Sequence, residues 1–141
     1  MAYNRITLQQ LARCRLEEAK VLAEENQPSG AQYLAGYAIE CALKARIASQ
    51  FLANEIPSKA LVNRIYTHDL AELVRLAGLE QELKAAIESD PLLARRWSVI
   101  VKWTEEIRYQ VCTDESASSM IEAVSGGEDG NGLFQWLTSR W

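Results

Sequence analysis

The segment that most constrains the fold runs from Ala31 to Ala45 and reads AQYLAGYAIECALKA. Its apolar residues fall on nearly every side of an α-helix instead of forming one stripe. No stretch of the chain is apolar and long enough to suggest a membrane span, so such a helix is predicted to be enclosed by neighbouring helices. We therefore place a long helix, over about residues 31–54, at the centre of the fold.

The remaining segments also show helical spacing of their apolar residues, beginning with a first helix that ends near residue 25. Ser58 and Thr67 are placed to cap shorter helices, and Asp90 with Pro91 forms a cap followed by a proline at the first helical position. No alternating segment is long enough to require a sheet, and no internal repeat is visible. The sequence predicts an all-α, up-and-down bundle of five to seven helices in which the second helix is long and central.

Two stretches are harder to assign. Residues 98–101 alone would fit a buried strand, but apolar residues from Leu93 to Val111 share one helical face, so we predict one helix from Pro91 to Cys112. Residues 125–132 read SGGEDGNG and predict a flexible surface turn. Glu128 and Asp129 would repel phosphate, and the later ligands of a calcium loop are missing.

The composition fits one soluble globular domain over residues 1–141, with 48% hydrophobic residues. Lys and Arg number 15 against 19 Asp and Glu, and this net charge of −4 gives no general attraction for nucleic acid. The three cysteines have no paired spacing, which predicts buried thiols in a reducing compartment and hence a cytoplasmic protein. With a single histidine, the sequence predicts no metal site, and no cofactor is indicated.

Glu40 is the first candidate functional residue, because it lies in the otherwise apolar central helix, where an unpaired carboxylate is costly. Lys44 is a local partner four residues on. Arg108 shares the apolar face of its own predicted helix and also needs a carboxylate, so we predict a structural ion pair between Glu40 and Arg108. Pairing of Arg108 with Glu105 is the alternative.

His68 is the one side chain that titrates near neutrality without help. It either fills a surface position in the first turn of a helix or takes part in binding. If it binds, we expect His68, Arg46 and Lys44 to contact a nucleotide or a partner. In a catalytic alternative, His68 acts as general acid or base, and Arg64 or another arginine binds the phosphate. These residues would meet at a dimer cleft.

Three segments in order resemble the HEPN domain family: residues 33–45 (YLAGYAIECALKA), His68-Asp69-Leu70, and Trp103 followed by Glu106-Ile107-Arg108-Tyr109. The ending GLFQWL at residues 132–137 is similar to one bacterial branch. The resemblance implies a helical bundle that commonly forms homodimers. It also implies a setting with a minimal nucleotidyltransferase partner, as toxin and antitoxin, or a ribonuclease role in defence with RNA as the ligand.

The ribonuclease branch of that family uses an arginine followed after four to six residues by histidine, and this sequence departs from that pattern. The catalytic roles are therefore not carried over, and we expect a noncatalytic module. The relevant positions hold Thr113, Asp114 and Glu115 after Arg108, and Leu61, Val62 and Asn63 before His68, with Arg64 one residue too near.

Overall fold

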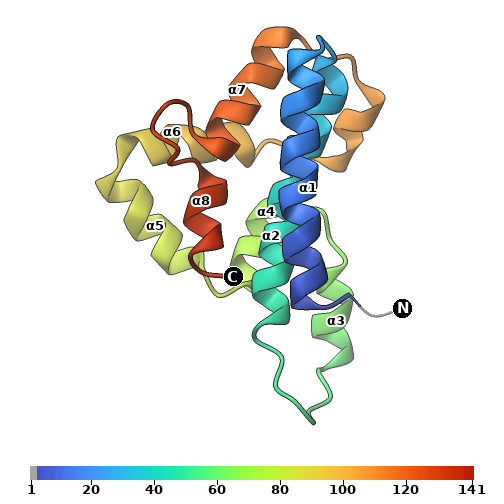
Figure 1. The fold of residues 1–141 in the computed structure, drawn as a ribbon. Helices are drawn as coiled ribbons and strands as arrows, with labels where there is room; N and C mark the ends of the chain where they lie inside the picture. The colour runs from blue at the N-terminus through green and yellow to red at the C-terminus, as the bar shows by residue number, and fades with distance from the viewer. Residues whose placement is uncertain (1–2) are drawn as a thin grey trace.

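The protein is described here by a computed structural model that covers residues 3–141, and these form helices and connecting segments without a strand. The predicted all-α class is confirmed (Figure 1). The described residues contain eight α-helices, one more than the predicted range, and three of the eight have seven residues or fewer. The helices are α1 (Arg5–Glu24), α2 (Pro28–Ala48), α3 (Lys59–Ile65), α4 (Leu70–Leu76), α5 (Glu80–Ser89), α6 (Pro91–Ile100), α7 (Asp114–Ser125) and α8 (Leu133–Thr138), with a 3-10 helix, η1 (Glu105–Tyr109), between α6 and α7.

Helices α1 and α2 form an antiparallel pair joined by a short turn, with α1 lying along the outside of the bundle (Figure 1). The inner face of α1 has a helical repeat of alternating leucine and alanine. The alanines allow α2 to approach closely while the leucines fill the space beside it. The buried residues of α1 are Leu8, Ala12, Leu16 and Ala19.

The central position of α2 is confirmed, since it packs against α1, α4, η1, α7 and α8. It buries eleven of its 21 residues, on most sides of the helix. It begins with Pro28 at its first position and ends at Ala48, six residues before the predicted end at Asn54. The reason is that the buried face runs out at Ile47. From Ser49 to Asn54 every residue is exposed, and Asn54 adopts a left-handed conformation with φ 69°.

The prediction of one helix from Pro91 to Cys112 is wrong. Helix α6 ends at Ile100, a turn follows, and η1 covers residues 105–109. The break lets Trp103 lie against α2, where only 3% of it is exposed and its ring stacks on Tyr33 with centroids 6.1 Å apart. Burial of this large indole over Gly36 favours the break over a continuous helix.

Arg96 holds the turn at residues 125–132, which the sequence predicts to be flexible. Arg96 is 4% exposed, and its guanidinium donates to Glu122 Oε1 at 2.6 and 3.0 Å. It also donates to both carboxylate oxygens of Asp129, each at 3.2 Å, and to the carbonyl oxygen of Asn131 at 2.8 Å. The glycine-rich loop is therefore fastened to α6 and α7.

Asp129 has a lowered pKa because the backbone N–H of Asn131 and the Arg96 guanidinium both donate to its carboxylate. A carboxyl group whose pKa is depressed by folding stabilises the fold above its ordinary pKa. That contribution is lost as the pH falls through the lowered value. The loop is thus expected to loosen in acid.

The cysteines differ from the prediction that all three are buried. Cys41 is buried, Cys112 is half-buried and Cys14 is exposed on α1. Burial raises the pKa of the Cys41 thiol to about 11. None of the helices within residues 3–141 combines the length and the apolar character needed to cross a membrane.

Substituting Gly36 by alanine is expected to destabilise the protein by about 2–3 kcal/mol, because the added Cβ would lie 2.2 Å from Nε1 of Trp103 and force the indole out. In an unobstructed helix the same change would stabilise the protein by about 1 kcal/mol. A fall in the free energy of unfolding would therefore indicate that Trp103 packs on Gly36. Urea unfolding measures the difference. Gly127→Ala is the control, since its nearest new neighbour lies 3.8 Å away. Equal stability of the two variants would contradict the packing of Trp103 on α2.

Replacing Arg96 by methionine keeps much of the buried volume but removes every hydrogen bond to the loop, and we expect a loss of about 1–3 kcal/mol. We also expect faster proteolysis within residues 126–132, because the anchored loop is released. Arg95→Met, at the exposed neighbouring position, should change stability by less than about 0.5 kcal/mol. Indistinguishable proteolysis of the two variants would show that Arg96 does not hold the loop.

Candidate functional site

The candidate site is built around Glu40, which is 3% exposed in the middle of α2. Its Oε1 lies 2.7 Å from Nδ1 of His68, and its Oε2 accepts a hydrogen bond from Nζ of Lys44 at 3.2 Å. Lys44 is one helical turn further along α2, and His68 comes from the segment just before α4. The carboxylate therefore joins the central helix to the start of α4 and has a donor on each oxygen.

This contact sets the protonation pattern of the imidazole. An ionised carboxylate can only accept hydrogen bonds, so Nδ1 of neutral His68 carries the proton and donates it to Glu40. Nε2 is then a bare acceptor. The His68 side chain is 43% exposed, while the carboxylate beneath it is 4% exposed. The arrangement presents one oriented nitrogen at the surface, supported from below by a buried charge.

His68 borders a cleft of about 250 Å³ between the start of α4 and the segment that follows α6. Trp103 forms part of its wall. Asp69 and Glu105 add two acidic residues to the lining. The lining residues are Thr67, His68, Asp69, Val101, Trp103, Thr104 and Glu105.

The cleft is rich in hydrogen-bond acceptors. Thr67 Oγ1 already accepts from the backbone N–H of Asp69, and Asp69 caps α4 by accepting from the N–H of Glu72. The Asp69 cap replaces the predicted Thr67 cap, because Asp69 directly precedes the first helical residue. Together with Nε2 of His68, these groups suit a ligand that donates hydrogen bonds or bears positive charge, and they repel phosphate.

The predicted ion pair between Glu40 and Arg108 is not among the interactions of residues 3–141, and Glu105 does not bind Arg108 there either. Arg108 lies in η1 with its guanidinium 5.0 Å from the Tyr109 ring centroid. Hydrogen bonding to the side chains of Tyr109 and Tyr33 raises its pKa. The prediction assumed a continuous helix, and the break after Ile100 moves Arg108 off the face on which that argument placed it.

The other predicted binding residues separate into two groups. Lys44 and His68 both bind the carboxylate of Glu40. Arg46 does not line the cleft; it donates to the carbonyl oxygens of Ala77 and Arg140, so it fastens the ends of α4 and α8 to α2. Arg64 donates to Glu72 at 2.6 Å on the surface. Neither arginine joins His68 as a phosphate ligand.

The chemistry open to this site is limited. A histidine held by a buried carboxylate has the form of a general base, but a phosphoryl transfer also needs a cation beside it. The nearest cation in the cluster, Lys44, is already bound to Glu40. The described part of the chain contains no group of three or more side chains suited to a metal ion.

Sequence reasoning found both Glu40 and His68 but did not pair them. The two residues are 28 positions apart, and the path of the connecting segment between α2 and α4 leaves no periodic signal. Arg96 was missed altogether, because its partners lie in a loop and on another helix. An arginine facing the apolar side of α6, followed by an acidic loop, was the only available signal.

Comparisons with known proteins give no match: no family model, no curated protein and no solved structure matches this chain.

A double-mutant cycle on Glu40 and His68 tests the buried contact. Glu40→Gln should destabilise by about 1–3 kcal/mol, because the amide nitrogen would face one of two donors. The loss should be smaller when His68 is already alanine, since one donor is gone. Thermal and urea unfolding measure the stability lost through Glu40→Gln in the wild type and in His68→Ala. Glu88→Gln, which changes an exposed carboxylate on α5, is the control. Strict additivity of the two substitutions would mean that the residues do not interact.

Proposed function

We propose that this protein is a noncatalytic HEPN-like helical module that forms homodimers and binds a partner through the cleft beside His68. The observation that carries the proposal is the buried Glu40 carboxylate, which holds His68 at the edge of an open, polar cleft of about 250 Å³. A buried charge that orients a single exposed side chain is more costly than an apolar residue would be, which favours a role in binding.

The lining of the cleft favours a protein partner over a nucleotide. Asp69 and Glu105 would repel phosphate groups, and Lys44 is bound to Glu40 instead of facing the cleft. Arg46, the second expected phosphate ligand, is used to hold the ends of α4 and α8. A lysine or arginine side chain of a partner protein meets acceptors throughout the cleft. A nucleotidyltransferase, the partner that the family resemblance implies, is the first candidate.

A ribonuclease is the second candidate function, and one observation favours it. His68 is oriented by a carboxylate through Nδ1, which leaves Nε2 unprotonated and able to act as a base. Its arginines would have to come from a second copy, because Arg64 is bound to Glu72. Metal-free cleavage of single-stranded or structured RNA by the wild type, abolished by His68→Ala, would replace the binding proposal with this one.

Filling the cleft tests the binding proposal directly. Thr104 is exposed at the rim, so Thr104→Arg should fold normally, occupy the cleft and weaken binding of the nucleotidyltransferase by about tenfold or more. Calorimetry with the purified nucleotidyltransferase measures this loss. A parallel titration with ATP should show no binding.

Two results would contradict the proposal. Unchanged affinity of Thr104→Arg would remove the cleft from the interface. Tight binding of ATP that Thr104→Arg abolishes would show that the cleft takes a nucleotide instead. Val111→Asp, at an exposed position outside the cleft, is the matched surface control.

A further inference from the structure

The segment between α2 and α4 projects from the bundle. Every residue from 49 to 60 is exposed. No residue of α3 is fully buried, although Leu61, Val62 and Ile65 are half-buried. In Figure 1 this loop and α3 extend beyond the end of the α1–α2 pair. We refer to residues 49–66 as the arm.

The arm carries apolar side chains that the rest of the protein leaves uncovered. Ile56 is 97% exposed, Leu52 65% and Phe51 42%. An isolated helix as short as α3 gains little stability from its own hydrogen bonds. Exposed apolar side chains gathered on one projecting segment are typical of a protein interface. The arm therefore has the character of a segment that packs against another surface.

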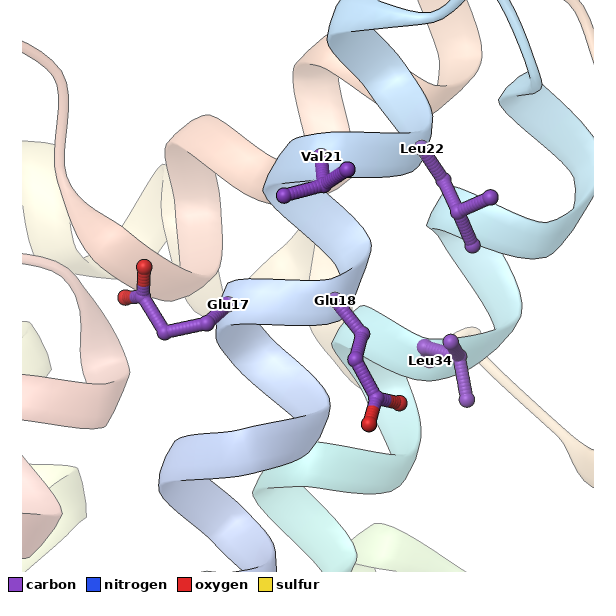
Figure 2. A pocket seen from close by; sticks show the side chains of 5 residues that line it. All are labelled: Glu17, Glu18, Val21, Leu22 and Leu34. Atoms are coloured by element: carbon purple, nitrogen blue, oxygen red, sulfur yellow. The ribbon is translucent and has the colours of Figure 1, made fainter.

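A matching surface lies on the outer face of the α1–α2 pair. Val21 and Leu22 on α1 and Leu34 on α2 line a shallow apolar groove of about 430 Å³. Glu17 and Glu18 border it (Figure 2). Val21 is 56% exposed, so the groove is open in the single chain.

The two surfaces offer single charged groups of opposite sign. Glu17 and Glu18 place carboxylates at the border of the groove, and Lys59 places a cation on the arm. Arg64 is bound to Glu72, but no carboxylate of the described residues binds Lys59. Lys59 is thus the arm's available cation.

The glutamates of the groove do have local partners. Glu17 pairs with Lys20 at 3.2 Å and Glu18 with Arg15 at 2.9 Å, both across one exposed helical turn. Exposed pairs across one helical turn are weak, so they are readily exchanged for an intermolecular partner. The groove therefore retains its attraction for a basic segment.

The positions of arm and groove suit a two-fold dimer. Because α1 and α2 are antiparallel, the arm lies at the end where α1 begins, and the groove lies in the second half of α1 (Figure 1). They are separated along α1 by about 20 Å, from the rise of 1.5 Å per residue. A two-fold axis perpendicular to α1 near its middle would place the arm of each copy against the groove of the other.

We infer that the arm of one copy seats in the groove of a second copy, and that two such contacts hold the dimer together. Ile56 and Leu52 pack against the aliphatic side chains of the groove, and Lys59 faces Glu17 and Glu18. This inference rests on the dimer of the proposed function and assigns the surface that forms it.

Charge reversal on the two surfaces tests the pairing. Lys59→Glu on one chain, and Glu17→Lys with Glu18→Lys on another, should each weaken self-association by about tenfold or more, because like charges meet at both contacts. Mixing the two variants restores opposite charges at both contacts, so the mixture should form heterodimers as tightly as the wild type dimerises. Analytical ultracentrifugation at micromolar concentration measures the association of each variant alone and of their mixture. Melting temperatures equal to that of the wild type confirm that the variants fold.

The possible results are distinct. If each variant still self-associates like the wild type, the arm and groove are not the interface. The dimer of the proposed function then forms through another surface. A monomeric wild type overturns both this inference and the dimer of the proposed function. If the two variants are monomeric alone and do not form heterodimers when mixed, the pairing of arm and groove is also overturned.

A second pair of substitutions tests the apolar part of the contact. Ile56 and Val111 are both 97% exposed, so aspartate at either position leaves the fold intact. Ile56→Asp should produce monomers, whereas Val111→Asp should remain dimeric. Identical behaviour of the two variants would contradict the seating of Ile56 in the groove.

Discussion

The structure depends on a single buried charge in its central helix. Helix α2 is enclosed on most sides, which gives the bundle its core, yet Glu40 places a carboxylate inside that enclosure. Such a group is tolerated only where donors reach both of its oxygens. One donor, Lys44, comes from the next turn of the helix, and the other must come from outside it. The position of His68, the start of α4 and the edge of the cleft all follow from that requirement.

A second constraint acts one helical turn before Glu40 on α2. Gly36 leaves room for Trp103, and the burial of that indole ends α6 and turns the chain into η1. The same turn carries Thr104 and Glu105 to the cleft opposite His68. The two walls of the cleft are thus positioned by two residues of α2, one charged and one without a side chain. This explains how a small helical bundle can hold a defined polar site.

The sequence predicted those parts of the structure whose signal is local. The helical class, the central helix, the Ser58 cap and the start of α6 at Asp90 and Pro91 are all confirmed, because each depends on residues within one or two turns. The predicted helix to Cys112 is wrong, since a single tertiary contact of Trp103 outweighs a regular apolar pattern. The local partner of Glu40, Lys44, was predicted and is present. The pairing of Glu40 with His68 and the anchoring of the loop by Arg96 were beyond the sequence, because both join residues more than twenty positions apart.

The central claim is that Glu40 holds His68 in one tautomer and so presents Nε2 to the cleft. Nitrogen-15 NMR of the imidazole tests it most directly, and the spectrum is simple because the chain contains one histidine. Above neutral pH the account predicts the tautomer protonated on Nδ1, and its loss in Glu40→Ala. Protonation on Nε2 in the wild type would contradict the contact from which the proposed function is derived.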